Sequence, residues 1–300
     1  MKLKSISLKD KARFNQYLKY SPHELAVYSF ADIFIWKALF DISWVVIDGN
    51  LCIFFKDNFG TFLYLPPLGK KFSPEAVLNS YDIAAGLNKN PEVTRIENIE
   101  DKEIASYRKL GFKCPLKSQD YLCLRKDLVD LSGNKLKSQR WARNYFLNHY
   151  EFEFSTLLAK DKQGCLDLYD SWMGMRKTGN PGHIYQGMME DSRIALQTAL
   201  ANYRALNLKG GVVRINKKIC GFTFGYELNK DAFCILYEVT DLSVKGLAQF
   251  IFSRNCAELK GYKYINVMDD SGLENLKKVK LAYKPVKLIP AYIAKNEQRP

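Results

Sequence analysis

The sequence predicts an α+β protein with two tandem domains, each a mixed, mainly antiparallel sheet flanked by helices. The chain has 300 residues, which suits two domains of about 100–200 residues each. The composition is 47% hydrophobic and 26% charged, which is typical of globular proteins and argues against disorder. Both halves also repeat one order of predicted elements: helices, a three-strand meander, a helix, a strand, a helix and a strand. We therefore expect domains over residues 1–130 and 131–300.

The first half begins with two predicted helices, over residues 8–19 and 22–40, because apolar residues recur there at helical spacing. Ser21, Pro22 and Glu24 fit an N-cap, a first-turn proline and an N3 glutamate for the second helix. Apolar stretches separated by Asp, Asn and Gly turns then predict an antiparallel meander. The three strands of the meander are expected over residues 43–48, 51–55 and 61–65. They are followed by a helix after Ser73, a strand over 94–99, a helix ending near 110 and a strand over 121–126.

The second half repeats this order with longer elements. It opens with a basic, aromatic helix over residues 135–150. The remaining elements are helices over 161–176 and 188–206, meander strands over 211–216, 219–228 and 233–239, a helix over 244–260, a strand over 262–268, a helix over 272–282 and a strand over 287–293. This is a repeat of architecture more than of sequence.

The net charge of +13 is spread unevenly along the chain. Residues 1–130 carry +3, whereas residues 131–300 carry +10. A basic half suggests an anionic partner such as nucleic acid, a nucleotide phosphate or a lipid headgroup. A lysine-rich, solvated surface would have the same composition.

Several classes of protein do not fit the sequence. Seven cysteines without a CxxC pair predict reduced thiols, and three scattered histidines argue against a zinc site, so we expect no metal. The charged N-terminus does not resemble a signal peptide. The most apolar segment, residues 25–40, is too short to span a bilayer. We expect a soluble, cytoplasmic protein with no integral membrane segment.

The strand over residues 233–239 leads into a short turn at the start of a predicted helix. Unpaired amides at a helix N-terminus can bind a phosphate, and small residues such as Gly246 and Ala248 allow it to approach closely. The turn resembles the Q/R-x-x-G-x-G/A segment that binds pyrophosphate in GNAT acyltransferases, with Ser243 where Gln or Arg is usual. An ordinary strand-to-helix turn would look much the same. The predicted cofactor-binding residues are Ser243, Val244, Lys245, Gly246, Leu247 and Ala248.

A broader resemblance covers nearly the whole chain. The matching stretches are ADIFIWKALF (31–40), LSGNKLKSQRWARNYF (131–146), LKGGVVRINKKICGFTFGYELN (208–229), LYEVTDLSVKGLAQFIF (236–252) and YINVMDDSGLENLKKVKLAYKP (264–285). They resemble soluble members of the phosphatidylglycerol lysyltransferase C-terminal-domain-like family, which have tandem GNAT folds. The chain departs from the family pattern at residues 266–273 and has lysine in 276–280 where an arginine is typical.

The resemblance implies transfer of an acyl or aminoacyl group to an amine or hydroxyl. In the named relatives the acyl donor is a charged tRNA and the acceptor is a lipid headgroup. An acceptor amine must lose a proton, so a carboxylate near the cleft is a candidate general base. We expect Glu238 to be this base and Asp270 to be a second carboxylate or an anchor for the acceptor amine. Alternatively, Glu238 pairs with a lysine, and Asp269 and Asp270 cap the following helix.

Two basic groups are candidates for substrate or RNA binding. Lys277 and Lys280 share one face of a predicted helix. Arg140 and Arg143 lie beside Trp141, and basic residues interleaved with aromatic residues suit a nucleic acid backbone and its bases. The same pattern also suits a helix whose aromatic residues pack inward.

The sequence therefore favours an acyltransferase with its chemistry in the second domain and a degenerate first domain. We expect no tightly bound cofactor, and either acyl-CoA or aminoacyl-tRNA as the acyl donor. The acceptor would be a small molecule, a peptide or a lipid headgroup. The alternatives are a non-catalytic RNA- or nucleotide-binding protein and a peripheral membrane protein. The oligomeric state is not predicted.

Overall fold

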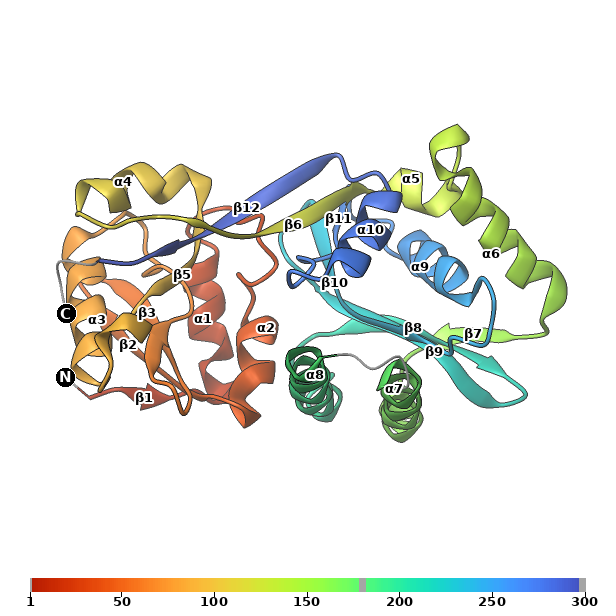
Figure 1. Ribbon diagram of the computed structural model, residues 1–300, viewed down its shortest axis with the longest axis horizontal. Coiled ribbons are helices and arrows are strands. Elements are labelled where there is room, and N and C mark those ends of the chain that lie inside the picture. Colours follow the sequence, from red (N-terminus) through yellow and green to blue (C-terminus); the bar gives the residue numbers. More distant parts are fainter. Residues whose placement is uncertain (1, 178–181, 297–300) are drawn as a thin grey trace. The chain divides into compact units, whose positions relative to one another are not determined.

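The computed structural model describes residues 2–177 and 182–296, and the chain forms two compact α+β units (Figure 1). Unit 1 comprises Met1–Asp120 with Ile289–Pro300, and unit 2 comprises Tyr121–Leu288. The α+β class is thus confirmed. The units divide at residue 120, ten residues before the expected boundary, and the last strand returns to unit 1 rather than closing unit 2.

Unit 1 contains a mixed sheet in the order β1-β2-β3-β4-β5-β12. Its pairs are antiparallel except for β4 with β5. The strands are β1 Lys4–Ser5, β2 Asp41–Ile47, β3 Asn50–Lys56, β4 Thr61–Leu63, β5 Ile96–Glu100 and β12 Lys287–Ala294. The helices are α1 Lys11–Leu18, α2 Phe30–Ile35, α3 Pro74–Gly86 and α4 Ile104–Lys109. Ser73 caps α3 by accepting the Ala76 amide, and Tyr81 of this helix is buried against the sheet core.

The predicted helix over residues 22–40 is wrong in its first half. The helix α2 begins at Phe30 after Ser29, whose hydroxyl oxygen accepts the Ala31 amide. Upstream of it, the Glu24 amide donates to Glu100 and the Ala26 amide donates to Asp120. Because carboxylates distant in sequence satisfy these amides, the segment needs no helical hydrogen bonds.

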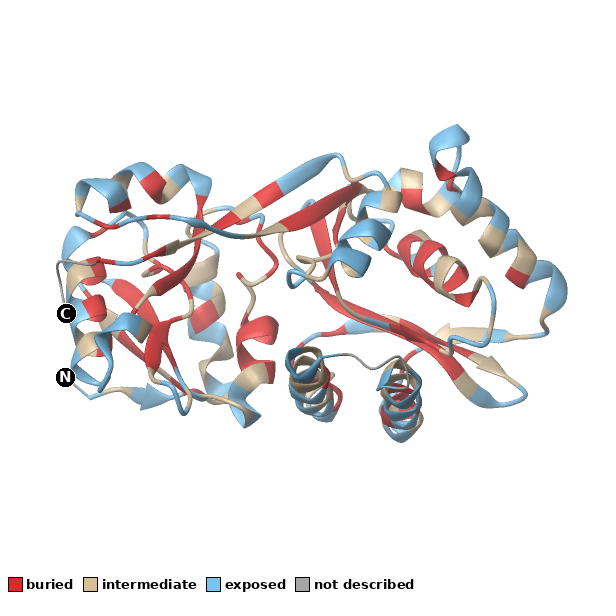
Figure 2. Ribbon diagram, in the orientation of Figure 1, coloured by how far each residue is buried: buried red, intermediate tan, exposed pale blue. Residues whose placement is uncertain are grey.

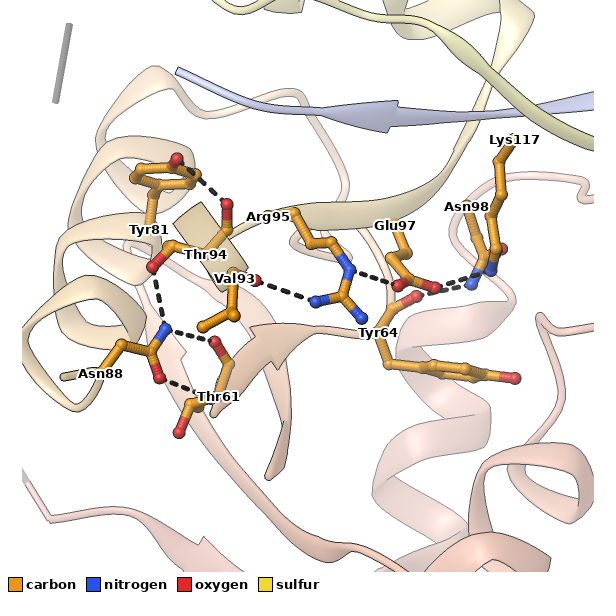
Figure 3. Close-up of polar contacts among 10 residues, drawn as sticks. All are labelled: Thr61, Tyr64, Tyr81, Asn88, Val93, Thr94, Arg95, Glu97, Asn98 and Lys117. Carbon is orange, nitrogen blue, oxygen red and sulfur yellow. Dashed lines mark hydrogen bonds and ion pairs between the residues drawn. The ribbon is translucent and has the colours of Figure 1, made fainter. Parts of the chain in front are cut away.

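A polar network surrounds β5 in unit 1 (Figure 3). The carboxylate of buried Glu97 accepts hydrogen bonds from Arg95 Nε and Lys117 Nζ, each at 2.6 Å. Burial opposes the charge of Glu97, but Lys117 and Arg95 outweigh it and lower the pKa of this carboxyl. Lys117 also donates to Asn98, and Asn88 donates to the Thr61 carbonyl oxygen. The network therefore balances a buried charge and ties neighbouring strands together.

The strands of unit 2 run in the order β6-β11-β10-β9-β8-β7, and among the described residues of this unit only β10 and β11 pair in parallel. They are β6 Leu116–Leu124, which enters this unit at Tyr121, β7 Glu153–Thr156, β8 Lys209–Ile215, β9 Lys218–Glu227, β10 Ala232–Thr240 and β11 Tyr264–Asn266. The helices are α5 Arg125–Asp130, α6 Lys137–His149, α7 Lys162–Lys177, α8 His183–Ala201, α9 Leu247–Glu258 and α10 Glu274–Ala282. Apart from residues 22–29, the predicted elements occur with ends shifted by a few residues.

Helices cover both faces of the unit 2 sheet. The helices α7 and α8 lie on one face, and α9 packs on the other with α6 against it (Figure 1). Strand β9 is buried along most of its length, as expected for a strand covered on both faces. Figure 2 shows α9 largely buried, whereas α10 is mostly exposed. In the described ranges, no helix is both long and apolar enough to cross a bilayer.

Candidate functional site

Glu238 lies on β10, just after a bulge at residues 235–237. The bulge breaks the expected alternation between Leu236 and Glu238. Bulges of this kind often redirect a side chain next to an active site. Glu238 is exposed on the surface of its strand, and desolvation by the surrounding protein raises the pKa of its carboxyl group to about 8. Among the described residues its carboxylate has no hydrogen-bond or ion-pair partner, so the predicted alternative of a lysine partner is not observed.

Tyr283, which the sequence analysis did not single out, is close enough to Glu238 for the carboxylate charge to raise its pKa. Its ring follows α10 and packs edge-on against Phe252 of α9, with centroids 4.7 Å apart. Burial, followed by the negative charges of Glu238, Cys256 and Cys123, raises the pKa of Tyr283. The site thus combines a carboxyl group that titrates near neutral pH with a phenol that stays protonated there. These are the properties of a general base and a hydrogen-bond donor.

Asp270 follows β11 in a turn that also contains two left-handed residues, Met268 and Ser271. The Tyr121 hydroxyl donates to one oxygen of Asp270, and the Gly272 amide donates to the other at 2.9 Å. Burial, followed by this bond to Asp270, raises the pKa of Tyr121. Both oxygens of Asp270 are therefore engaged, one by β6 and one within the turn.

The expected helix capping by Asp269 and Asp270 does not occur. The N-cap of α10 is Leu273, and no side chain caps it. Instead, Asp269 accepts the Ser271 amide within the turn. In the described part of the chain, no hydrogen bond or ion pair joins Asp270 to Glu238, although Glu238 lies near the carboxyl end of β10 and Asp270 follows that of the parallel strand β11.

The predicted phosphate-binding turn precedes α9. Gly246 is the N-cap of this helix, with a φ of 82°. A Cβ atom at this position would lie 2.0 Å from the carbonyl oxygen of Ala142 in α6, so close packing alone already requires glycine. Within the described residues, the amides of Ala248 and Gln249 in the first turn of α9 have no hydrogen-bond partner. The turn therefore offers the amides that a phosphate needs, together with a structural reason for its glycine.

Lys245 in the same turn lies over two aromatic rings of α6. Its ammonium is 4.8 Å from the Trp141 ring centroid and 4.6 Å from that of Tyr145. Tyr145 in turn stacks on His149 at 3.9 Å, and Trp141 is 57% exposed. The sequence alternative in which these aromatic residues simply pack inward therefore does not hold for Trp141.

The predicted RNA-binding arginines have internal partners. Arg140 donates to the Leu131 and Gly133 carbonyl oxygens, and Arg143 donates to the carbonyl oxygen of Val129 at 3.1 Å. These carbonyl groups lie at or after the end of α5, which Leu131 closes in a left-handed conformation. Both arginines thus stabilise a helix C-terminus.

The two predicted lysines differ in their surroundings. Lys280 donates to the carbonyl oxygens of Val267 and Asp269, which fixes α10 to the turn that carries Asp270. Lys277 is exposed and has no partner among the described residues. Of these two lysines, only Lys277 is free to meet a ligand.

Comparison with known proteins identifies the family. The family model "Phosphatidylglycerol lysyltransferase, C-terminal" matches residues 19–295. A conserved protein of unknown function from Bacteroides thetaiotaomicron is 29% identical, with a TM-score of 0.86 over 97% of this chain and 98% of that one. The comparison with curated proteins gives no match.

Two further solved structures share the fold at low identity. One is a C-terminal domain assigned to a lysylphosphatidylglycerol synthetase of Agrobacterium fabrum, 14% identical with a TM-score of 0.68 over 96% of this chain and 92% of that one. The other is L-PGS from Bacillus licheniformis, 15% identical with a TM-score of 0.67 over 97% and 93%. The chain belongs to the family of phosphatidylglycerol lysyltransferase C-terminal domains.

Proposed function

We propose that this protein transfers an activated aminoacyl or acyl group to an amine or hydroxyl, with the chemistry in unit 2 and with unit 2 folded as a GNAT-like domain. The observation that carries the proposal is Glu238: a solvent-accessible carboxylate without a partner among the described residues, whose pKa burial raises to about 8. A carboxyl group with a pKa shifted this far and no partner is a candidate for proton transfer.

In the proposed reaction, Glu238 removes a proton from the acceptor amine or hydroxyl. The acceptor attacks the carbonyl carbon of the acyl donor and forms a tetrahedral intermediate. The intermediate then expels the ribose oxygen of tRNA, or the thiolate of CoA, and this leaving group takes a proton from the Tyr283 phenol. Glu238 returns that proton equivalent to Tyr283 directly or through water, which restores both groups. A base with a pKa near the working pH is the most effective kind.

The acyl donor is placed at the turn before α9. The amides of Ala248 and Gln249 would bind a phosphate, which both CoA and the end of a tRNA provide. An aminoacyl-tRNA is favoured because Lys245, Trp141 and Tyr145 form a basic, aromatic surface beside this turn, and such surfaces suit stacked bases. The names of the solved relatives agree with an aminoacyl donor.

A second candidate is a non-catalytic RNA-binding protein that retains the fold. The specific observation in its favour is that Asp270 and Lys280, two of the expected site residues, make internal contacts. Both candidates predict RNA binding, but only the first predicts turnover.

The test is transfer from labelled lysyl-tRNA or labelled acetyl-CoA to two acceptors, phosphatidylglycerol vesicles and a short peptide with a free amine. We expect labelled product with the tRNA donor, and a rate that falls about 100-fold or more in Glu238→Gln. The matched control is Glu153→Gln, an exposed glutamate on the edge strand β7 of the same unit. Labelled product at equal rates in wild type and Glu238→Gln would refute the assigned base, and RNA binding without any product would favour the second candidate.

A further inference from the structure

Unit 2 contains a hollow that the proposed reaction does not use. Its volume is about 550 Å³, within the range of pockets that bind small molecules. It lies where β6 ends and β11 begins, at Leu124 and Tyr264, which pair on these adjacent strands. Asp270 follows the opposite end of β11, and Glu238 lies near the corresponding end of the parallel strand β10. The hollow is therefore distinct from the candidate catalytic residues.

The charged side chains that line this hollow are all positive. The ionised side chains that line it are Arg125, Lys126 and Lys263, and no carboxylate lines it among the described residues. None of the three cations forms an ion pair in the described structure. Two acidic residues contact the lining: Glu227 accepts the Tyr262 hydroxyl at 2.7 Å, and the backbone carbonyl oxygen of Asp231 accepts the Lys263 and Tyr264 amides. Like charges gathered around a concave surface concentrate the field and attract an anion.

The arginine of this group is held in place before any ligand arrives. Arg125 donates from Nε to the Tyr262 carbonyl oxygen at 3.0 Å and from Nη1 to the Cys256 carbonyl oxygen at 3.1 Å. Its backbone amide also donates to the Lys263 carbonyl oxygen. A guanidinium fixed in this way loses little side-chain entropy on binding an anion.

The rest of the lining is aromatic and aliphatic. Tyr262 and Tyr264 contribute rings, and Val286, which is 50% exposed, contributes an apolar wall. Lys263 lies over the Tyr264 ring at 5.0 Å from its centroid. A free inorganic ion would use the cations but leave this apolar surface uncovered.

We infer that this hollow binds the phosphomonoester group of an organic molecule, with the cations on the phosphate and the tyrosine and valine side chains against the organic part. Three cations in the lining suit a group with a charge near −2, which a phosphomonoester carries at neutral pH. A carboxylate ligand would supply only half of that charge. A nucleotide and a glycerophosphate headgroup share this chemistry.

The test is calorimetric titration of the full chain with adenosine 5′-monophosphate, glycerol 3-phosphate, inorganic phosphate and adenosine. We expect at least one phosphomonoester to bind about tenfold or more tightly than both inorganic phosphate and adenosine, with an affinity that falls as salt rises. Tighter binding of the nucleotide or of the glycerophosphate would identify the source of the ligand.

Two variants locate the binding. The double variant Lys126→Gln/Lys263→Gln should weaken binding at least tenfold, whereas Lys217→Gln/Lys218→Gln, with the same charge change on an exposed turn of unit 2, should leave it within about twofold. Val286→Trp should block binding by filling the hollow while all three cations remain. The inference is overturned if adenosine binds as well as its phosphate, if inorganic phosphate binds as well as both esters, if no ester binds at millimolar concentration, or if the lysine or tryptophan variants bind normally. None of these outcomes depends on acyl transfer.

Discussion

Each unit has a glutamate on a strand whose charge desolvation disfavours, and the two glutamates respond in opposite ways. In unit 1, Arg95 and Lys117 contact Glu97, and these cations lower its pKa despite burial. In unit 2, Glu238 has no such partner among the described residues, and burial raises its pKa to about 8. The cost of burying a charge is met in the first case by ion pairs and in the second by binding a proton. Glu97 is therefore suited to holding a fold together, and Glu238 to exchanging protons.

The largest expected effect is on the transfer rate, which should fall when Glu238 is replaced but not when Glu97 is replaced. Glu238→Gln should lower the transfer rate about 100- to 10,000-fold, because an amide cannot accept the proton of the acceptor. In wild type the rate should rise with pH through about 8, as Glu238 loses its proton. Initial rates from pH 6 to pH 9 measure both effects. Glu97→Gln, assayed per folded molecule, is the control, and a similar loss in that variant would remove the distinction.

The next largest effect is on the free energy of unfolding, which should fall when Glu97 is replaced. Glu97→Gln leaves Arg95 and Lys117 without their carboxylate and should cost about 2–3 kcal/mol, less than for a fully buried pair because both cations partly reach solvent. The pKa of Glu97 is lowered in the folded state, so its contribution is present above the unfolded pKa and is lost as the pH falls through the folded value. Urea denaturation at pH 7 and pH 3.5 should show the difference between variant and wild type shrinking in acid. A constant difference would contradict it.

A third variant examines the neighbour of Glu238. Tyr283→Phe removes the phenol that would protonate the leaving group, and we expect about a tenfold lower rate, or about 1.4 kcal/mol of barrier. The ring contact with Phe252 should survive, because phenylalanine keeps the same packing. Tyr262→Phe, whose hydroxyl contacts Glu227 outside the catalytic group, is the matched control. Equal rates for Tyr283→Phe and wild type, with single-turnover kinetics showing chemistry to be limiting, would exclude the phenol from the reaction.

The same comparison shows what sequence reasoning can reach. The sequence indicated Glu238 as a candidate base because its strand leads into a turn that begins a helix, and the order of such neighbouring elements can be predicted from sequence. Tyr283 was missed because its place depends on α10 packing against Phe252 of α9, a contact that no spacing encodes. The prediction of a helix over residues 22–29 was wrong for a similar reason. Carboxylates distant in sequence, Glu100 and Asp120, accept hydrogen bonds from amides of this segment.

The basic residues of α6 show where sequence reasoning gives a prediction that the tertiary structure does not support. Their spacing predicted a nucleic acid surface, but Arg140 and Arg143 reach the carbonyl groups that end α5. The helix α5 ends at Leu131, which has a left-handed backbone conformation. This conformation is unusual for leucine, and the sequence pattern does not predict it. Sequence thus locates charges well, but whether a charge faces a ligand or a carbonyl group depends on tertiary structure.

The smallest expected effect is the change in stability when Glu238 is replaced, and its direction is opposite to that expected for Glu97. Removing the carboxylate of Glu238, the proposed base, should make the protein more stable, because the folded state holds Glu238 in an environment that disfavours its charge. The folded pKa lies above the unfolded one, so between about pH 4.5 and pH 8 the folded protein binds more protons, and wild-type stability falls as the pH rises. Glu238→Gln lacks this loss. Its advantage should be near zero at pH 4.5 and reach about 1 kcal/mol above pH 8, a modest value because the side chain reaches solvent. Melting curves of both proteins across this range measure it, and a Glu238→Gln protein that is less stable at pH 8.5 would mean that the carboxylate has a stabilising partner after all.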